Sequence, residues 1–102
     1  MKTLITILLA MGWLFSTTAL AGDAAAGKSK AASCIGCHGV AGISVNPLWP
    51  NLAGQHEDYL VKQLKDFKSG ARKDPNMNAL AAPLSDADMA DIAAFFASQP
   101  CK

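Results

Sequence analysis

The sequence lacks an excess of charge of either sign. Its 102 residues contain nine lysines and arginines against eight aspartates and glutamates, which gives a formal net charge of +1. Proteins that bind nucleic acid usually carry a strong basic excess, because the phosphate backbone attracts clustered lysine and arginine side chains. We therefore expect no nucleic acid among the partners of this chain.

The sequence also lacks strand-like alternation, internal repeats and low-complexity segments. Beyond residue 21, no stretch alternates apolar and polar residues in the way that a half-buried β-strand does. The predicted fold class is therefore all-α. The length is enough for one small domain. A domain of this size buries only a modest core, so a cofactor with a large apolar surface would add to its stability.

A hydrophobic run long enough to cross a membrane is missing too. The strongest run fills most of residues 4–15, which is shorter than the roughly 20 residues that a membrane anchor needs. It follows a positively charged start and precedes small residues that end at Ala21, an arrangement typical of a secretory signal peptide. We expect cleavage of residues 1–21. Residues 22–102 would then form a single domain in the periplasm, without an integral membrane segment.

Cysteine is scarce, and two of the three cysteines lie in one short motif, Cys34-Ile35-Gly36-Cys37-His38. C-x-x-C-H is an attachment signature of c-type haem. The thiols of Cys34 and Cys37 would form thioether bonds to two vinyl groups, and His38 would be the proximal axial ligand of the iron. The sequence thus predicts one covalent haem c. Two other interpretations are a thiol–disulfide redox site and half of a zinc site.

The third cysteine, Cys101, lies next to the C-terminus. Cys34 and Cys37 would be used up as thioethers, so Cys101 would be left alone. An odd cysteine in an exported protein indicates an intermolecular bridge or an exposed thiol. It can also be an incidental residue on a frayed end. A disulfide-linked dimer through Cys101 is therefore one of two open expectations.

Three segments carry helical signals. Residues 24–32 are rich in alanine and follow Asp23, a good N-cap. Residues 57–69 repeat apolar side chains at helical spacing and precede Gly70. The third segment starts after Ser85 with a sequence that resembles a capping box, continues with helical apolar spacing and precedes Pro100.

Two glycines near the haem motif receive specific roles. Gly27 costs about 1 kcal/mol in a helix relative to alanine, so we expect it to let another helix cross closely. Gly36 is expected to allow a tight turn before His38.

Residues 39–55 and 70–84 are predicted to be loops, because turn residues punctuate them and no helical period is visible. Three side chains could provide the second axial ligand of the iron. Met89 lies on an apolar helix face, where methionine is ordinary core, and His56 lies at a helix start. Met77 lies in the middle of the longer loop and is the predicted distal ligand. An open distal site is the remaining possibility.

With these residues placed, the chain resembles class I c-type cytochromes, close to the small bacterial mono-haem c4/c5/c553 group. The resemblance covers residues 22–102. The motifs that carry it are Cys34-x-x-Cys37-His38, Pro50-Asn51-Leu52-Ala53-Gly54-Gln55, Tyr59-Leu60-x-x-Gln63-Leu64, Asp74-Pro75-x-Met77 and Leu84-Ser85-Asp86-x-Asp88-Met89.

The resemblance implies three main helices and loops wrapped around one haem, with the first and last helices crossing near Gly27. It also implies Met77 as distal ligand. The carbonyl of Pro50 would accept a hydrogen bond from His38 and orient the imidazole ring. The c5-type members carry a second cysteine pair, but Cys101 has no such partner, so an internal disulfide is excluded.

The predicted function is electron transfer by a soluble periplasmic protein that cycles between Fe(II) and Fe(III) and is not an enzyme. We expect a transient electron donor and a transient electron acceptor as partners. The basic side chains within residues 62–73 form either a docking patch for them or a solvated helix face. The main alternative is a haem protein with an open or labile distal site, acting in small-ligand sensing or peroxidase-like catalysis. A thiol oxidoreductase is a third possibility.

Overall fold

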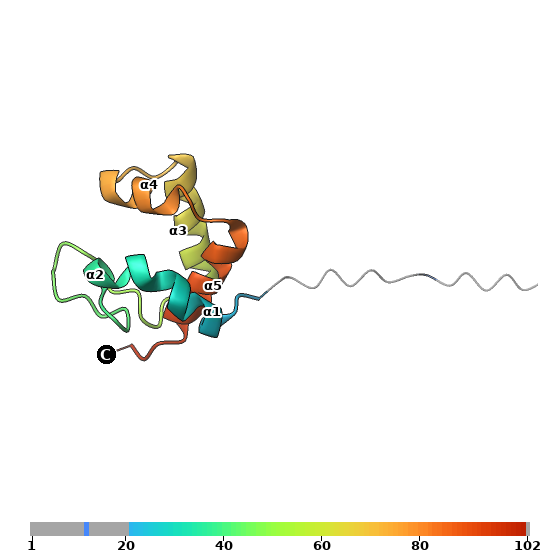
Figure 1. Cartoon of the computed structure of the whole chain (residues 1–102), viewed down its shortest axis with the longest axis horizontal. Coiled ribbons are helices and arrows are strands. Elements are labelled where there is room, and N and C mark those ends of the chain that lie inside the picture. Colours follow the sequence, from blue (N-terminus) through green and yellow to red (C-terminus); the bar gives the residue numbers. More distant parts are fainter. Residues whose placement is uncertain (1–11, 13–20, 102) are drawn as a thin grey trace, which may run out of the picture.

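The structure, a computed structural model, describes Gly12 and residues 21–101, and this part of the chain contains helices and no strand (Figure 1). The helices are, in order, α1 (Ala24–Lys30), the 3-10 helix η1 (Ala31–Ser33), α2 (Ile35–His38), α3 (Glu57–Ser69), α4 (Pro75–Ala81) and α5 (Asp86–Ala97). The predicted all-α fold class is confirmed. Apart from Gly12 and Ala21, the predicted signal peptide lies outside the described residues. None of the described helices is both long and apolar enough to span a membrane.

The crossing of α1 and α5 is the tightest helix contact that positions the site. A Cβ atom on Gly27 would lie 1.8 Å from the carbonyl oxygen of Asp91 and 2.9 Å from the Cβ of Phe95. Only glycine lets the two backbones approach this closely. The predicted role of Gly27 at a close crossing is therefore confirmed.

Polar contacts hold the same two helices together at their edge. Asp91 accepts a hydrogen bond from the backbone N–H of Asp23 at 2.8 Å and one from the ammonium of Lys30 at 2.6 Å. Lys30 also pairs with Asp88 at 3.1 Å. The pKa of Asp91 is lowered, mostly by the hydrogen bond from Lys30 and next by the one from the N–H of Asp23. The two carboxylates raise the pKa of Lys30.

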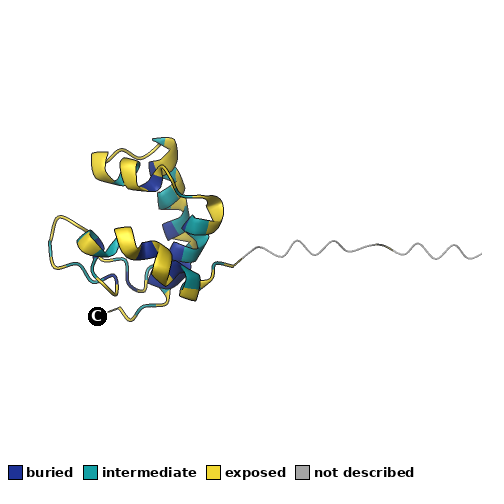
Figure 2. Ribbon diagram, viewed as in Figure 1, coloured by how far each residue is buried: buried dark blue, intermediate teal, exposed yellow. Residues whose placement is uncertain are grey.

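Helix α5 carries most of the hydrophobic core. Its buried apolar side chains pack against Leu60 of α3 and Ala31 of η1. Figure 2 colours the buried residues of the ribbon dark blue. Those of α5 in this cluster are Ile92, Ala93, Phe95 and Phe96. Met89 is 1% exposed, which agrees with its prediction as a core residue.

The start of α5 is fixed by the predicted capping box. The backbone N–H of Asp88 donates to the hydroxyl of Ser85 at 3.0 Å, and the N–H of Ser85 donates to the Asp88 carboxylate at 3.0 Å. Two backbone donors that a helix start leaves unpaired are thereby satisfied. The end of α3 is also as predicted, since Gly70 takes the left-handed conformation with φ of 83°.

Residues 70–84 contain a short helix, α4, so the prediction of a loop without regular structure was wrong there. Asp74 is the N-cap, and its carboxylate accepts hydrogen bonds from the N–H groups of Asn76 and Met77. Pro75 occupies the first helical position, where its missing N–H costs nothing and its fixed φ favours a helix. Met77 consequently lies in the first turn of a helix and not in the middle of a loop.

The expected role of Gly36 was also wrong. Gly36 lies inside α2, and its φ is not positive. The chain turns one residue after His38, at Gly39, whose φ is 85°. A Cβ atom there would also lie 2.0 Å from the carbonyl oxygen of Ile43, so this is the position where the turn requires glycine.

Candidate functional site

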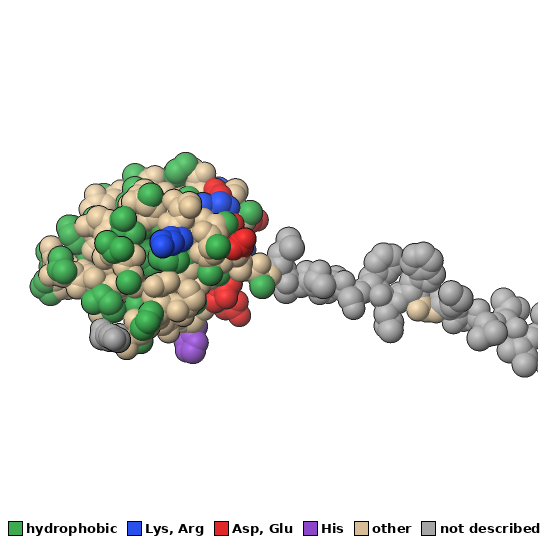
Figure 3. Space-filling view, turned by 60° about the horizontal axis from the view of Figure 1, so that its bottom comes forward, with side chains coloured by type: hydrophobic (Ala, Val, Ile, Leu, Met, Phe, Trp, Pro, Cys, Tyr) green, Lys and Arg blue, Asp and Glu red, His purple; other side chains and the backbone are tan. Residues whose placement is uncertain are grey.

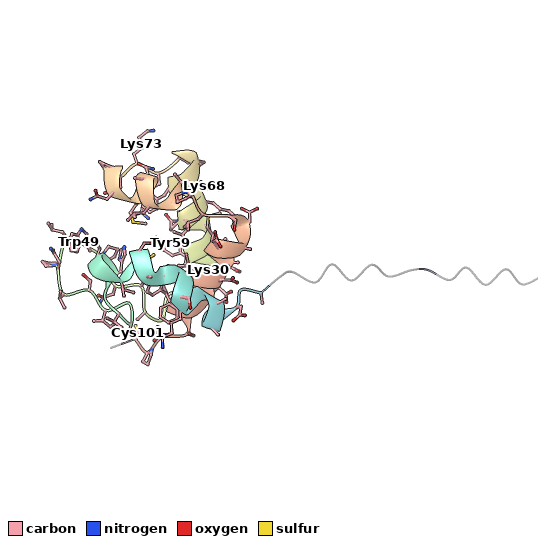
Figure 4. All side chains as sticks on the ribbon, in the orientation of Figure 1. Lys30, Trp49, Tyr59, Lys68, Lys73 and Cys101 are labelled. Carbon is pink, nitrogen blue, oxygen red and sulfur yellow. The ribbon has the colours of Figure 1, made fainter. Side chains whose placement is uncertain are left out.

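A pocket of about 400 Å³ lies between α2 and α4, and α3 and α5 contribute its inner wall. Figure 1 shows α2 and α4 on opposite sides of this region. Trp49 and Tyr59, both labelled in Figure 4, line the pocket together with many aliphatic side chains. Besides Pro50 and Met77, the apolar members of the lining are Leu48, Trp49, Leu52, Leu60, Leu64, Phe67, Leu80, Ala81, Leu84, Ile92, Ala93 and Phe96.

The C-x-x-C-H motif forms one side of the pocket. Cys34 is the N-cap of α2, and its carbonyl accepts a hydrogen bond from the N–H of His38 at 3.0 Å. Side chains three positions apart share one face of a helix, so this single turn presents Cys34 and Cys37 together. Both thiols and the imidazole of His38 line the pocket. A motif local in sequence is therefore also local in space.

The ring of His38 is fixed by one hydrogen bond. Its Nδ1 lies 2.9 Å from the carbonyl oxygen of Pro50. A carbonyl oxygen only accepts, so Nδ1 carries the proton and donates, and Nε2 keeps its lone pair. Within the described part of the chain, Nε2 makes no hydrogen bond, although His38 is only 7% exposed. This is the tautomer that a metal-binding histidine needs.

The loop that carries Pro50 is held by side chains that the sequence analysis did not single out. The single hydroxyl hydrogen of Ser44 is shared between the carbonyl of Cys37 at 3.3 Å and that of Asn46 at 2.9 Å. The N–H of Ser44 donates to the side-chain oxygen of Asn51 at 2.7 Å. These bonds tie the loop to α2 beside the motif. Asparagine and serine next to a proline are common turn residues, but that pattern does not say which backbone groups they bind.

Met77 lies on the opposite side of the pocket. It is half-buried and shares the lining face of α4 with Leu80 and Ala81, three and four residues further on. The two other candidates for a second axial ligand lie elsewhere. His56 is exposed at the N-cap of α3, and Met89 is buried in the core. Neither is among the pocket-lining residues.

The surroundings of the thiols do not fit a thiol–disulfide catalyst. Burial raises the pKa of the Cys34 thiol, the nearby Cys37 raises it further, and a contact with the Ser33 hydroxyl only partly opposes this. Reactive cysteines of redox enzymes have a lowered pKa, because the thiolate is the nucleophile. Among the described residues no group of three or more His, Cys, Asp or Glu side chains is placed to hold a metal ion, whereas a structural zinc site needs four ligands.

The donor groups and the pocket do fit a covalently attached haem. Two thiols come from one helical turn, the oriented imidazole faces the same space, and a flat apolar macrocycle would find aliphatic and aromatic walls. The volume is within the roughly 300–1,000 Å³ that is usual for ligand pockets. A second hollow of about 470 Å³ is lined by residues 44–51 alone and contains neither thiol nor imidazole. An all-helical domain with this arrangement defines the class I c-type cytochromes.

The chain belongs to the cytochrome c family. The family model described as Cytochrome c matches residues 24–100. Cytochrome c4 of Pseudomonas aeruginosa is 53% identical over 98 residues, which are 96% of this chain and 48% of that relative. Cytochrome c-554(548) of Halomonas halodenitrificans is 48% identical over 82 residues, which are 78% of this chain and 99% of that relative. Haem c is therefore the cofactor of this site.

Comparison with solved structures gives the same fold. The crystal structure of reduced recombinant cytochrome c4 from Pseudomonas stutzeri superposes with a TM-score of 0.75 and 50% sequence identity, over 78% of this chain and 47% of that chain. The chain thus spans about half the length of the cytochrome c4 relatives that it matches. The match to cytochrome c-554(548), in contrast, extends over nearly the whole of that relative.

The basic side chains within residues 62–73 are largely engaged with their own surroundings. Lys62 pairs with Asp66 at 2.6 Å. Lys68 donates to the carbonyl of Leu84, and Lys73 donates to that of Gly70. On the face that Figure 3 shows, hydrophobic and uncharged side chains predominate and charged side chains are few. A docking patch and a solvated helix face both stay open as predictions.

Cys101 is exposed and follows α5. A Cβ on Gly54 would lie 2.8 Å from its Cβ, so its backbone runs close to the 39–55 segment. Nothing in the described part of the chain points to a disulfide-linked dimer, which stays a prediction from sequence.

Proposed function

We propose that this protein is an electron carrier, exported to the periplasm as the domain 22–102, with one haem c bound through Cys34 and Cys37 and ligated by His38 and Met77. The observation that carries the proposal is the placement of His38 and Met77 on facing sides of one apolar pocket. With both thiols used as thioethers, His38 and Met77 would supply the His/Met pair that is found in cytochromes c. Transient electron donors and acceptors are the partners that such a carrier needs.

When bound, the haem supplies a one-electron Fe(II)/Fe(III) couple. The protein supplies the environment of that couple. His38 presents Nε2 in a fixed direction because Pro50 holds its Nδ1–H, and such bonds raise the basicity of a ligating histidine. Met77 contributes a neutral, soft thioether, which raises the potential relative to a second imidazole.

The arrangement supports a carrier rather than an enzyme. His38 and Met77 would together hold the iron of the bound haem, which would leave neither oxygen nor a substrate an open site at the metal. The same two side chains serve both oxidation states, so little of the protein has to rearrange during transfer.

Met77→Ala tests the proposal. We expect the variant to keep its covalent haem, because the thioethers and His38 are untouched, and to show a lower reduction potential and rapid binding of carbon monoxide in the reduced state. The parent protein should bind carbon monoxide poorly. Met89→Leu is the matched control, because it changes a buried methionine outside the pocket and conserves volume. Its potential should equal that of the parent.

An unchanged potential in Met77→Ala would mean that the distal ligand is assigned wrongly. Rapid binding of carbon monoxide by the parent would favour the open-site alternative, in which the protein senses small ligands or catalyses a peroxidase-like reaction. A mature protein without covalent haem in its mass spectrum would leave the thiol oxidoreductase as the better interpretation.

A further inference from the structure

Both polar atoms of the Asn78 side chain make hydrogen bonds to backbone groups at the end of α3, in the link between α3 and α4, and at the start of α4. Its amide nitrogen donates to the carbonyl of Phe67 and to the carbonyl of Arg72, both at 2.8 Å. Its amide oxygen accepts from the backbone N–H of Asp74 at 2.9 Å. Three of the four hydrogen bonds that an asparagine side chain can make are therefore used on backbone groups.

These three backbone groups belong to the parts of the chain that set the position of α4. Phe67 is in the last turn of α3, and its carbonyl also accepts the N–H of Gly70 at 3.4 Å. Arg72 is in the link between the two helices, and Asp74 is the N-cap of α4. One side chain thus fastens the end of α3, the link and the start of α4 to each other.

Helix α4 depends on such an anchor. It has only seven residues, and an isolated helix of that length is not stable in water. Helix α3 is the element against which α4 packs. Met77 precedes Asn78 and lies on the pocket-facing side of α4, whereas the amide of Asn78 points toward α3. The hydrogen bonds of Asn78 therefore help to set the position of the Met77 thioether sulfur.

We propose that Asn78 is a positioning residue for Met77, which keeps the thioether of Met77 directed at the iron in the oxidised protein. The inference rests on the proposed function, since it requires Met77 to be the distal ligand. Without the three bonds of Asn78, α4 can tilt away from the pocket while the haem stays attached through the thioethers and His38. The fraction of molecules with an open distal position then rises.

Binding of imidazole to the oxidised holoprotein measures this fraction. Imidazole competes with Met77, so its apparent affinity increases with the population that has an open distal position. Each hydrogen bond lost contributes a factor on the order of ten at most. We expect Asn78→Ala to bind imidazole roughly tenfold or more tightly than the parent and to show a weaker absorption band of the iron–sulfur bond. Asn78→Asp should behave similarly, because it keeps the shape and the acceptor but loses both donated bonds.

Gln99→Ala is the matched control. Gln99 also donates from a side-chain amide to a helix carbonyl, that of Phe95 at 3.1 Å, but it does not line the pocket. This variant should lose thermal stability while its imidazole affinity and iron–sulfur band stay those of the parent.

The outcomes distinguish a failure of the positioning role of Asn78 from a failure of Met77 as the distal ligand. Unchanged imidazole affinity in both Asn78 variants would show that Asn78 is a structural residue only. An equal rise in Gln99→Ala would show that general destabilisation opens the site, which also refutes a positioning role. Met77→Ala should bind imidazole more tightly than every other variant. If it binds no more tightly than the parent, Met77 is not the ligand and the proposed function itself fails.

Discussion

Replacement of Gly27 by alanine tests whether the approach of α1 to α5 is as close as the structure shows. The added Cβ would lie 1.8 Å from the carbonyl oxygen of Asp91, whereas real Cβ atoms essentially never come within 3.0 Å of such a neighbour. The obstacle is backbone, so no side chain can rotate out of the way. The two helices would have to separate by at least about 1 Å at their crossing.

The expected loss of stability follows from this separation. Overpacking a well-packed core costs about 1–3 kcal/mol and occasionally more. Alanine returns about 1 kcal/mol through its higher helix propensity. Because the clash is with backbone and also disturbs the bonds of Asp91, we place the net cost near the top of that range, at about 3 kcal/mol. In a domain of this size each kcal/mol lowers Tm by about 4–8 °C, so Tm should fall by about 12–24 °C.

Thermal unfolding of the holoprotein, followed by circular dichroism, is the assay. Gly36→Ala is the matched control, since Gly36 is also helical but a Cβ there would have no neighbour within 4 Å. This variant should be as stable as the parent or gain up to about 1 kcal/mol. If Gly27→Ala unfolds within a few degrees of the parent, the close crossing is wrong, and so is the explanation of the glycine.

Two further predictions concern the start of α5 and its contact with α1. Asp91→Asn should lower the free energy of unfolding at neutral pH and make it depend less on pH in the acid range. The pKa of Asp91 is lowered in the folded state. The stabilisation by its carboxylate is therefore present at neutral pH and is lost as the pH falls below about 4. Urea midpoints between pH 7 and 2 measure this, and parallel curves for the two proteins would contradict it. Ser85→Ala removes the capping hydroxyl that accepts from Asp88 and should cost about 1 kcal/mol. Denaturant unfolding measures this cost, and the visible spectrum should not change.

The long helices could be predicted because each carries several signals at once. The segment that forms α3 combines a helical apolar period with a glycine just beyond its end, and α5 combines such a period with a capping box. Helix α4 was missed because seven residues are too few for a period to show. Its start was nevertheless readable, since Asp74 followed by Pro75 is a favourable N-cap followed by a favourable first helical residue.

The candidate site also has residues that the sequence predicts and residues that it does not. The attachment motif is contiguous, so Cys34, Cys37 and His38 could be assigned from sequence alone. The contact between His38 and Pro50 was expected only because of the family resemblance, since no pattern in the chain relates residues twelve positions apart across a loop. Asn78 was not singled out. Its partners are backbone carbonyls, which carry no signature in the sequence.

The two sides of the pocket are anchored with different strength. On one side, which would carry the thioethers, the bond between His38 and Pro50 is reinforced by Ser44, which ties the loop to α2. On the other side, Met77 is carried by a seven-residue helix that depends on α3 and Asn78. With Met77 as the proposed distal ligand, a change in residues 70–76 would alter that ligand without releasing the haem. Under the proposed ligation, substitutions on the α4 side would tune the potential and the access of small ligands, while the α2 side would fix the haem in place.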